Sequence, residues 1–192
     1  MSRMNLGIIG GGQLGSLLSV AAKKLDIKTT IYSDDPDAPA QNFSDDFVFG
    51  DYNDKEKIIE FVKKVDLITY EFENIPFETL NEINKSKQVL PKPSVNRLIQ
   101  HRLAEKDFIN KLNIRTTRYV SIEKKSDIET LGDFLPGILK TTTMGYDGKG
   151  QYPITKIEDL NNLNLDFSKG YLLEKLVKLK KEISVIITRF GN

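Results

Sequence analysis

Short apolar runs and amphipathic stretches alternate through the first half of the chain. Residues 6–9 are apolar and run into a group of glycines, and residues 14–25 carry leucine and alanine at helical spacing. Residues 27–32 then follow the alternating pattern of a second strand. A strand, a helix and a strand in this order predict a βαβ unit with parallel strands.

The same alternation continues to about residue 93. Residues 47–49 and 67–70 predict a third and a fourth strand, and Asp54 is placed to cap a helix between them. Val89 and Leu90 predict a fifth strand, which the prolines of residues 91–93 would end. We therefore expect a first α/β domain over residues 1–93.

The pattern changes after this point. Ser94 is placed to cap a helical region that reaches Leu112, with Arg97, Arg102 and Lys106 on its polar side. The β-branched run at 182–187 predicts a final strand. Between them, short apolar runs predict strands at 117–120, 135–139, 152–154 and 171–173, so a second unit is expected over residues 94–192.

A glycine-rich loop at residues 140–151 is the first candidate site. A short apolar strand leads to Lys140, and Gly145, Gly148 and Gly150 follow, with Lys149 between the last two. Glycines at this density let backbone N–H groups converge on an anion, and lysines add point charges suited to phosphate. The pattern favours a phosphate cradle, although a hairpin with solvated lysines has the same composition.

A second glycine group lies near the N-terminus. Residues 10–15 read Gly-Gly-Gly-Gln-Leu-Gly and fit G-x-G-x-x-G, the turn that binds phosphate at a helix N-terminus. Asp34 follows at the distance of a ribose-binding acid, which favours a nicotinamide or flavin enzyme. Tight packing of a helix on a strand requires the same glycines, so this motif alone is weak.

Two acidic residues follow the fourth strand. Glu71 and Glu73 stand at its carboxyl end, where open α/β sheets bind ligands. If the strand continues to Glu73, both side chains share one face of the sheet. Such a pair could hold sugar hydroxyls or an amine, and solvated acids at a sheet edge have the same spacing.

Composition narrows the class of protein. The 192 residues are 39% hydrophobic and 29% charged, as in an ordinary soluble globular protein. A net charge of +1 gives no general attraction to nucleic acid or to an anionic membrane. The absence of cysteine and the single histidine, His101, exclude thiolate chemistry and argue against a histidine metal centre. The apolar run near the N-terminus is too short for a signal peptide or a membrane span, so we expect the cytoplasm.

Taken in order, these motifs resemble one family, the ATP-grasp enzyme 5-(carboxyamino)imidazole ribonucleotide synthase of purine biosynthesis. The Tyr-Glu-Phe-Glu-Asn-Ile-Pro motif at 70–76 and the Gly-Tyr-Asp loop at 145–151 are specific to it, whereas the N-terminal glycines are not. The resemblance implies a Rossmann-like pre-ATP-grasp domain at 1–93, followed by the first part of an ATP-grasp domain. The other matching segments are residues 10–15, 36–40 and 174–177, together with Lys140 and Glu182.

The resemblance implies a reaction and roles for residues. ATP phosphorylates bicarbonate to carboxyphosphate, and the carboxyl group passes to the exocyclic amine of aminoimidazole ribonucleotide, leaving ADP and phosphate. Asp147 is the candidate for accepting the proton of the attacking amine, beside Tyr146 and Lys149. In the resemblance, the backbone of residues 175–177 recognises adenine, and Glu182 accepts hydrogen bonds from the ribose hydroxyl groups. The implied ATP-binding residues are Arg102, Lys140, Gly145, Tyr146, Asp147, Gly148, Lys149, Gly150, Gln151, Glu174, Lys175, Leu176, Val177 and Glu182. The implied ribonucleotide-binding residues are Gly12, Gln13, Leu14, Glu71 and Glu73.

Family members continue beyond Asn192, and the resemblance places acidic and asparagine ligands for Mg²⁺ in that continuation. We therefore expect ATP and Mg²⁺ as cofactors, no metal ligand within these residues, and no turnover by this chain alone. Full-length members are expected to be homodimers that act on small molecules, without nucleic-acid or membrane partners. Three alternatives stay open: another ATP-grasp carboxylase or ligase, an NAD-dependent oxidoreductase, and a non-catalytic fragment.

Overall fold

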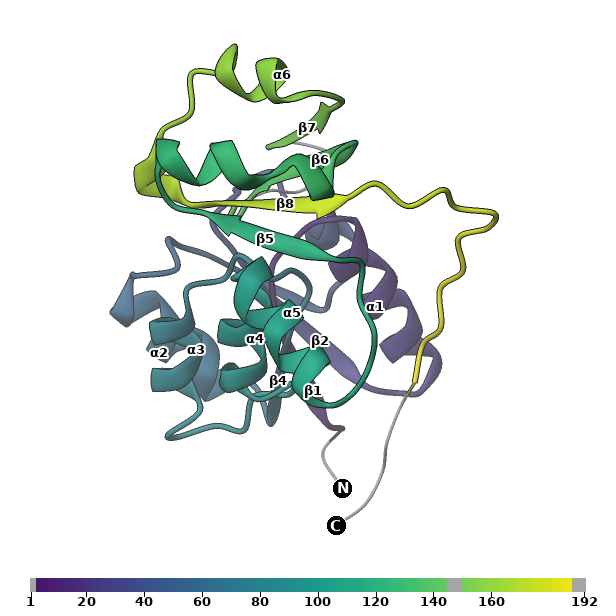
Figure 1. Cartoon of the computed structure of the whole chain (residues 1–192). Coiled ribbons are helices and arrows are strands. Elements are labelled where there is room, and N and C mark those ends of the chain that lie inside the picture. The colour runs from purple at the N-terminus through teal and green to yellow at the C-terminus, as the bar shows by residue number, and fades with distance from the viewer. Residues whose placement is uncertain (1–2, 145–149, 188–192) are drawn as a thin grey trace. The chain divides into compact units, whose positions relative to one another are not determined.

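The structure of the chain is a computed structural model that describes residues 3–144 and 150–187 (Figure 1). Its contacts divide the chain into two compact units, Met1–Glu105 and Lys106–Asn192. The boundary after residue 93, suggested by the sequence, stays a prediction about the domains of the family. Among the described residues, no helix is both long and apolar enough to cross a membrane.

The first unit is built on a parallel sheet with the strand order β3-β2-β1-β4. The pairs β1–β2, β1–β4 and β2–β3 are all parallel, which confirms the predicted βαβ unit. The strands are β1 (Asn5–Ile9), β2 (Lys28–Ser33), β3 (Asp46–Phe49) and β4 (Leu67–Tyr70), and the helices are α1 (Gln13–Lys24), α2 (Lys55–Lys64), α3 (Phe77–Ile83) and α4 (Pro93–Ile99).

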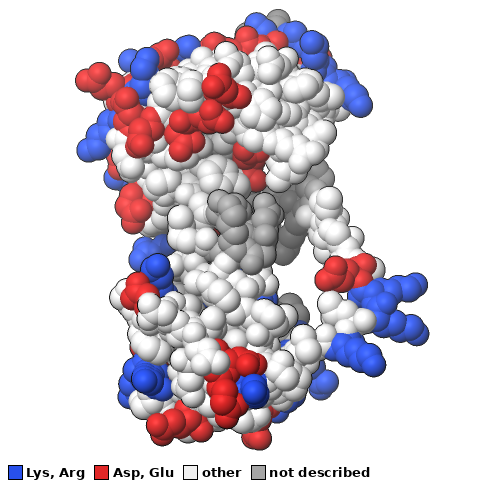
Figure 2. All heavy atoms as spheres, turned by 90° about the horizontal axis from the view of Figure 1, so that it is seen from above, with Lys and Arg blue, Asp and Glu red and all other residues white. Residues whose placement is uncertain are grey.

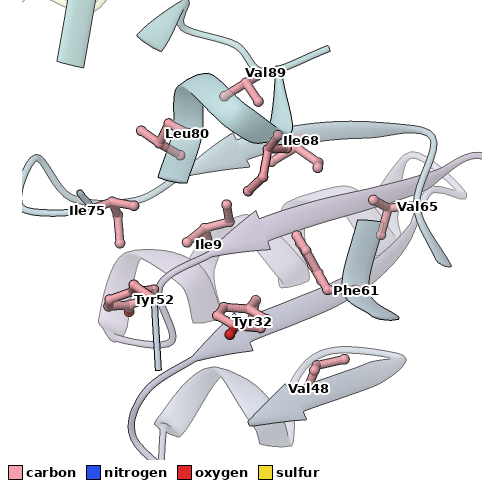
Figure 3. Close-up of a cluster of buried hydrophobic side chains, with 11 residues drawn as sticks. Ile9, Tyr32, Val48, Tyr52, Phe61, Val65, Ile68, Ile75, Leu80 and Val89 are labelled. Carbon is pink, nitrogen blue, oxygen red and sulfur yellow. The ribbon is translucent and has the colours of Figure 1, made fainter. Parts of the chain in front are cut away.

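Alternate residues of the strands fill two separate cores, one on each face of the sheet. Ile8 and Ile31 pack with Ala40 on the face towards α1. Ile9 and Tyr32, their neighbours along the strands, join a larger cluster on the other face. Figure 3 shows this larger cluster, in which side chains from the sheet meet Phe61 of α2 and Leu80 of α3.

Helix α2 begins where the sequence predicts. The Asp54 carboxylate accepts hydrogen bonds from the backbone N–H groups of Glu56 and Lys57, so Asp54 is the N-cap. Helix α1 is also where the sequence predicts, but it buries the small residues Gly15, Ser19 and Ala22. Its leucines point outward because close packing of α1 on the strands leaves room only for small side chains.

The second unit is an antiparallel sheet with the order β5-β8-β6-β7. Its core contains Ile122, Leu139, Leu160 and Leu173. The two strands predicted on either side of the glycine loop are confirmed, and they pair directly as β6 and β7. The strands are β5 (Tyr119–Ile122), β6 (Gly137–Thr141), β7 (Gln151–Ile154) and β8 (Tyr171–Lys175), and the helices are α5 (Arg102–Lys111), which starts before the division, and α6 (Ile157–Asn161).

Three predictions about elements are wrong. Val89 makes only an isolated bridge to Ile68, because prolines follow it and cannot donate to a ladder. Ser94 does not cap the helical region that reaches Leu112, because α4 begins at Pro93 after the N-cap Lys92 and Ser94 lies inside it. The region consists of two helices, and His101 accepts the N–H of Ala104 at the start of the second. The run at 182–187 forms no strand: it pairs with no strand among the described residues, and its apolar side chains are exposed.

Acidic and basic side chains are interspersed over the face of the molecule in view in Figure 2. This face has both signs side by side, in keeping with a net charge of +1. On this face, an anion site would have to be a local arrangement of charges, because no broad basic surface is seen among the described residues in view.

Candidate functional site

In the second unit, one carboxylate forms ion pairs with two lysines. Lys140 Nζ lies 2.8 Å from Glu174 Oε2, and Lys106 Nζ lies 2.9 Å from Glu174 Oε1. Their side chains are 20%, 15% and 11% exposed for Lys140, Lys106 and Glu174, so the cluster is largely withdrawn from water. We call these three residues the lysine–glutamate cluster.

Strand register explains how the cluster assembles. Glu174 on β8 lies opposite Ile138 on β6, and Lys140 is two residues further along β6, so the two side chains are diagonal neighbours on one face. Tyr119 on β5 lies opposite Glu174 on the other side. Lys106 reaches this row from α5, with its ammonium 5.4 Å from the centroid of the Tyr119 ring.

The electrostatics of the cluster favour an anion. Burial would raise the pKa of Glu174, but the hydrogen bonds and charges of Lys140 and Lys106 outweigh burial and hold that pKa below its usual value. The glutamate is therefore ionised at neutral pH. Two ammonium groups and one carboxylate leave one positive charge in excess, partly shielded from solvent, where it attracts an anion more strongly than on an open surface.

The glycine loop begins and ends beside this cluster. Lys140 pairs with Gln151 across β6 and β7, and Thr141 donates its N–H to the carbonyl of Gly150. Gly150 has a φ of +69° and approaches Thr141 closely, so a side chain there would be strained. The predicted residues Gly145, Tyr146, Asp147, Gly148 and Lys149 lie outside the described residues.

The predicted adenine-reading segment follows directly from β8. The Lys175 N–H donates to the carbonyl of Arg118 and the Leu176 N–H to that of Pro136, while the Lys175 ammonium donates to the carbonyl of Asp133. These bonds fix the exit of the chain from β8. Val177 is half-exposed directly after them.

Glu182 and Arg102 are two further residues that the family resemblance implies in ATP binding. Glu182 is exposed in an irregular segment, and no contact given for the described residues links it to Lys140 or Glu174. Arg102 is the first residue of α5, four residues before Lys106. The roles of Glu182 and Arg102 stay predictions.

The N-terminal glycine turn has an internal partner. The Glu71 carboxylate accepts the N–H of Gly12 through Oε1 and the N–H of Gly15 through Oε2, each at 2.5 Å. Strand β4 ends at Tyr70, so the condition for Glu71 and Glu73 to share a strand face is not met. Glu71 instead turns onto the start of α1, where it meets the positive end of the helix dipole.

Glu73 has a different setting. Its backbone carbonyl accepts hydrogen bonds from the side-chain amides of Asn96 on α4 and Gln100, at 2.8 and 2.7 Å. Gln13 and Leu14 are the first two residues of α1, and both are exposed. Binding of a ribonucleotide by these residues stays a prediction.

Asp34, the candidate ribose-binding acid of a dinucleotide site, has a protein partner. Burial and the neighbouring Asp34 carboxylate raise the pKa of the Tyr52 hydroxyl, and Asp34 and Tyr52 are hydrogen-bonded. The two features that favoured a dinucleotide, the glycine turn and Asp34, are both engaged by side chains of the first unit. This weakens the oxidoreductase alternative.

Lys106 is the site residue that the sequence did not reveal. Its position on the polar side of a helix was visible, but its contact with Glu174 depends on how β8 and α5 pack. Among the described residues, no group of three or more histidine, aspartate or glutamate side chains is placed to hold a metal ion. Glu174 does not suit a divalent cation, because both its oxygens already face ammonium groups.

Both units match models of known protein families. Residues 3–100 match the family model of the ribonucleotide synthetase pre-ATP-grasp domain, and residues 107–192 match that of the ATP-grasp domain. The two matched segments meet near the division between the compact units.

Two curated bacterial relatives carry the same name. N5-carboxyaminoimidazole ribonucleotide synthases from Staphylococcus aureus and Aquifex aeolicus are 34% and 36% identical to this chain, each over 97% of it. A crystal structure of the Staphylococcus aureus enzyme complexed with ADP has a TM-score of 0.84 and 30% identity, and covers 93% of this chain and 49% of its own. The chain spans about half the length of these relatives.

Proposed function

The chain belongs to the ATP-grasp family of N5-carboxyaminoimidazole ribonucleotide synthases, and we propose that its second unit binds the phosphates of ATP through the lysine–glutamate cluster. The main support for this proposal is the excess positive charge of Lys140, Lys106 and Glu174 where the glycine loop begins. Phosphate groups suit this cluster because lysine ammonium groups donate to oxygen anions without a fixed geometry.

Each member of the cluster has a separate task in this proposal. Lys140 meets the phosphates directly, since it stands at the mouth of the loop opposite Gln151. Glu174 holds both ammonium groups in place before nucleotide arrives, which lowers the entropy cost of binding. Lys106 offsets the charge of Glu174, so that Lys140 keeps its attraction for an anion.

The adenine would lie against the backbone that leaves β8. The N–H groups of Lys175 and Leu176 already have protein partners, which keeps this backbone rigid. We propose that Val177, directly beyond these fixed groups, is the contact for the adenine edge. Glu182 would receive the ribose hydroxyl groups, as the family resemblance implies.

The whole enzyme, as we propose it, carboxylates aminoimidazole ribonucleotide in purine biosynthesis. ATP transfers its γ-phosphoryl group to bicarbonate, which gives carboxyphosphate and ADP, and the amine then takes the carboxyl group and releases phosphate. Asp147 would accept the proton that the amine loses. Mg²⁺ supplies charge neutralisation to such a transfer. We place the ribonucleotide near Glu73, and expect a cytoplasmic homodimer from the family.

Titration of the chain with ADP tests the nucleotide site. We expect the substitution Lys140→Met to weaken ADP binding about tenfold or more, because it removes one charge-assisted contact to phosphate. Lys106 continues to pair with Glu174 in this variant, so the unit stays folded. Isothermal titration calorimetry measures the affinity.

The matched control is Lys57→Met. Lys57 lies on the exposed side of α2 and forms a surface ion pair with Glu60, so its loss should leave ADP affinity unchanged. Equal ADP affinities of the wild type and Lys140→Met would overturn the proposed site. A loss of affinity in both variants would show a nonspecific effect of charge and would also count against the proposal.

A further inference from the structure

A groove of about 690 Å³ lies between helices α2 and α3 of the first unit. Figure 1 shows the two helices side by side. Both pack onto the same face of the parallel sheet, where Phe61 of α2 and Leu80 of α3 join one core cluster. All residues that line the groove belong to the first unit, so its shape does not depend on the second.

The floor of the groove is mostly apolar. Ile58 and Val62 on α2 and Thr79 and Ile83 on α3 are its less exposed lining residues, and each pair is spaced by four residues along its helix. Ile83 belongs to the buried core, and Ile58 and Val62 pack against it. Beside them Ile59 is 53% exposed, which adds apolar surface that no described residue covers fully.

The two rims of the groove carry opposite charge. Each rim is a row of exposed residues at four-residue spacing, so its side chains lie along one line of the helix surface. The rows are Lys55, Ile59 and Lys63 on α2, and Glu78, Glu82 and Ser86 on α3. Lys55, Lys63 and Glu78 form no ion pair with any described residue, so their charges are open to a ligand.

The two rims are close enough to act on each other. Lys85, which forms an ion pair with Glu82 on α3, is the main cause that holds the pKa of the Glu82 carboxyl below its usual value. The charge of Lys55, on the opposite rim, lowers this pKa further. An occupant of the groove would therefore lie between a positive and a negative row and meet both.

The groove is formed before any occupant arrives. The Asp54 carboxylate caps the start of α2, and the Thr79 hydroxyl on α3 donates a hydrogen bond of 2.8 Å to the carbonyl of Tyr52. Tyr52 is itself buried in the core. Both walls are thus fixed near their N-terminal ends, which lowers the cost of binding.

We propose that this groove docks an amphipathic helix of a partner protein, with acidic residues along one flank and basic residues along the other. A helix in a groove places apolar residues at i, i+3, i+4 and i+7 on the floor, and its two flanks then face the two rims. Complementary charge requires acids beside Lys55 and Lys63, and bases beside Glu78 and Glu82. Helix α2 has 10 residues, so about three turns of a partner helix match its length.

Three synthetic peptides test the proposal on the full chain. They share one apolar face and carry mixed flanks, two acidic flanks or two basic flanks, and they are stapled because short isolated helices are marginal in water. Fluorescence anisotropy at low ionic strength measures their affinities. We expect the peptide with mixed flanks to bind at least about fivefold more tightly than either of the others. Shifts of the Ile59 and Ile83 methyl resonances on binding locate the site.

Reversal of one rim gives the sharpest variant. Glu78→Lys together with Glu82→Lys makes both rims basic, and we expect the peptide with two acidic flanks to become the tightest binder. Glu56→Lys together with Glu60→Lys is the matched control, because it changes net charge equally on α2 but outside the groove. The control should keep the wild-type order of affinities. All four acids are exposed, so both double variants should stay folded.

A single substitution tests the apolar contact. Ile59→Glu places a charge beside the floor and should weaken binding of the mixed peptide about tenfold or more. Leu17→Glu is the control, since Leu17 is an equally exposed apolar residue on α1, outside the groove. It should leave the affinity unchanged.

Four results would overturn the proposal. They are the lack of binding by any peptide, equal affinities of all three, an unchanged order of affinities after reversal of the acidic rim, and binding that Ile59→Glu does not weaken. Self-association of the chain that Ile59→Glu abolishes would assign the groove to a second copy and would also overturn it. None of these results involves Lys140, so the nucleotide site proposed for the second unit is tested separately.

Discussion

The two glycine-rich segments of this chain differ in the charge that faces them. At the N-terminal turn, one carboxylate meets backbone donors, and the positive end of α1 is neutralised within the first unit. At the root of the 140–151 loop, one carboxylate meets two lysines and leaves positive charge in excess. In our proposal, the excess positive charge makes the second segment the one that attracts phosphate.

The comparison shows that a glycine motif provides space for an anion but does not determine whether that anion is a side chain of the protein or a bound ligand. In the first unit the anion is Glu71, which the chain supplies itself. In the second unit Glu174 pairs with two lysines, and its single negative charge offsets only one of their two positive charges. We therefore expect the number of cations that face the acid to decide which segment takes a phosphate ligand.

The largest effect is expected from Gly10→Ala. The new Cβ would meet Glu71 Cγ at 2.4 Å, and the φ of +104° is unfavourable for alanine. Overpacking and backbone strain together should lower the free energy of unfolding of the first unit by about 3 kcal/mol. Hydrogen exchange of the β1 amides measures this change.

Gly132→Ala is the control for that substitution. No atom lies within 4 Å of a Cβ at Gly132, so the change should alter stability by less than about 1 kcal/mol. If Gly10→Ala were as harmless as Gly132→Ala, the tight enclosure of Glu71 by the glycine turn would be refuted.

An intermediate effect is expected from Glu174→Gln. The amide replaces one acceptor oxygen by an NH₂ donor, which cannot accept from the ammonium group it faces, and Lys106 and Lys140 then lie close together without a compensating charge. Loss of one partner from a largely buried ionic group should cost about 2 kcal/mol in the second unit. Hydrogen exchange of the β8 amides reports this loss.

The surface pair Glu82–Lys85 provides the reference for Glu174. Its side chains are mostly exposed, so Glu82→Gln should change stability by less than about 0.5 kcal/mol. A similar small cost for Glu174→Gln would mean that the lysine–glutamate cluster is no better organised than an ordinary surface pair.

The smallest effect is a pH dependence. The pKa of Glu174 in the folded chain lies below its usual value of 4.5, so the unfolded chain takes up the proton first as the pH falls. The stability that ionised Glu174 contributes is fully present above pH 4.5 and is lost as the pH falls through the folded pKa. Thermal unfolding followed by circular dichroism should show this acid-dependent part in the wild type. If the acid-dependent loss of stability were equally large in Glu174→Gln, it could not come from the Glu174 carboxylate.

Local patterns in the sequence predicted much of the fold. The βαβ unit, the Asp54 cap and the two strands on either side of the glycine loop depend on neighbours in the chain, and all three are confirmed. The run at 182–187 has strand propensity but no partner strand among the described residues, so propensity alone misled.

The sites were predictable in part. The sequence pointed to Lys140 and Glu174 through the family resemblance, and the strand register brings them together. It missed Lys106, whose partner comes from a distant strand, and it left the direction of Glu71 open. The Glu71 contact arises because β4 stops at Tyr70, and the ends of strands are set by tertiary packing.

Titration of the ¹⁵N-labelled chain with ADP tests the central claim that the second unit, and not the glycine turn of the first, takes the phosphates. The account predicts saturable shifts of the Lys140 and Thr141 amides on β6, with the Gly12 and Gly15 resonances unchanged. Saturable shifts of Gly12 and Gly15 without any change at Lys140 and Thr141 would contradict it.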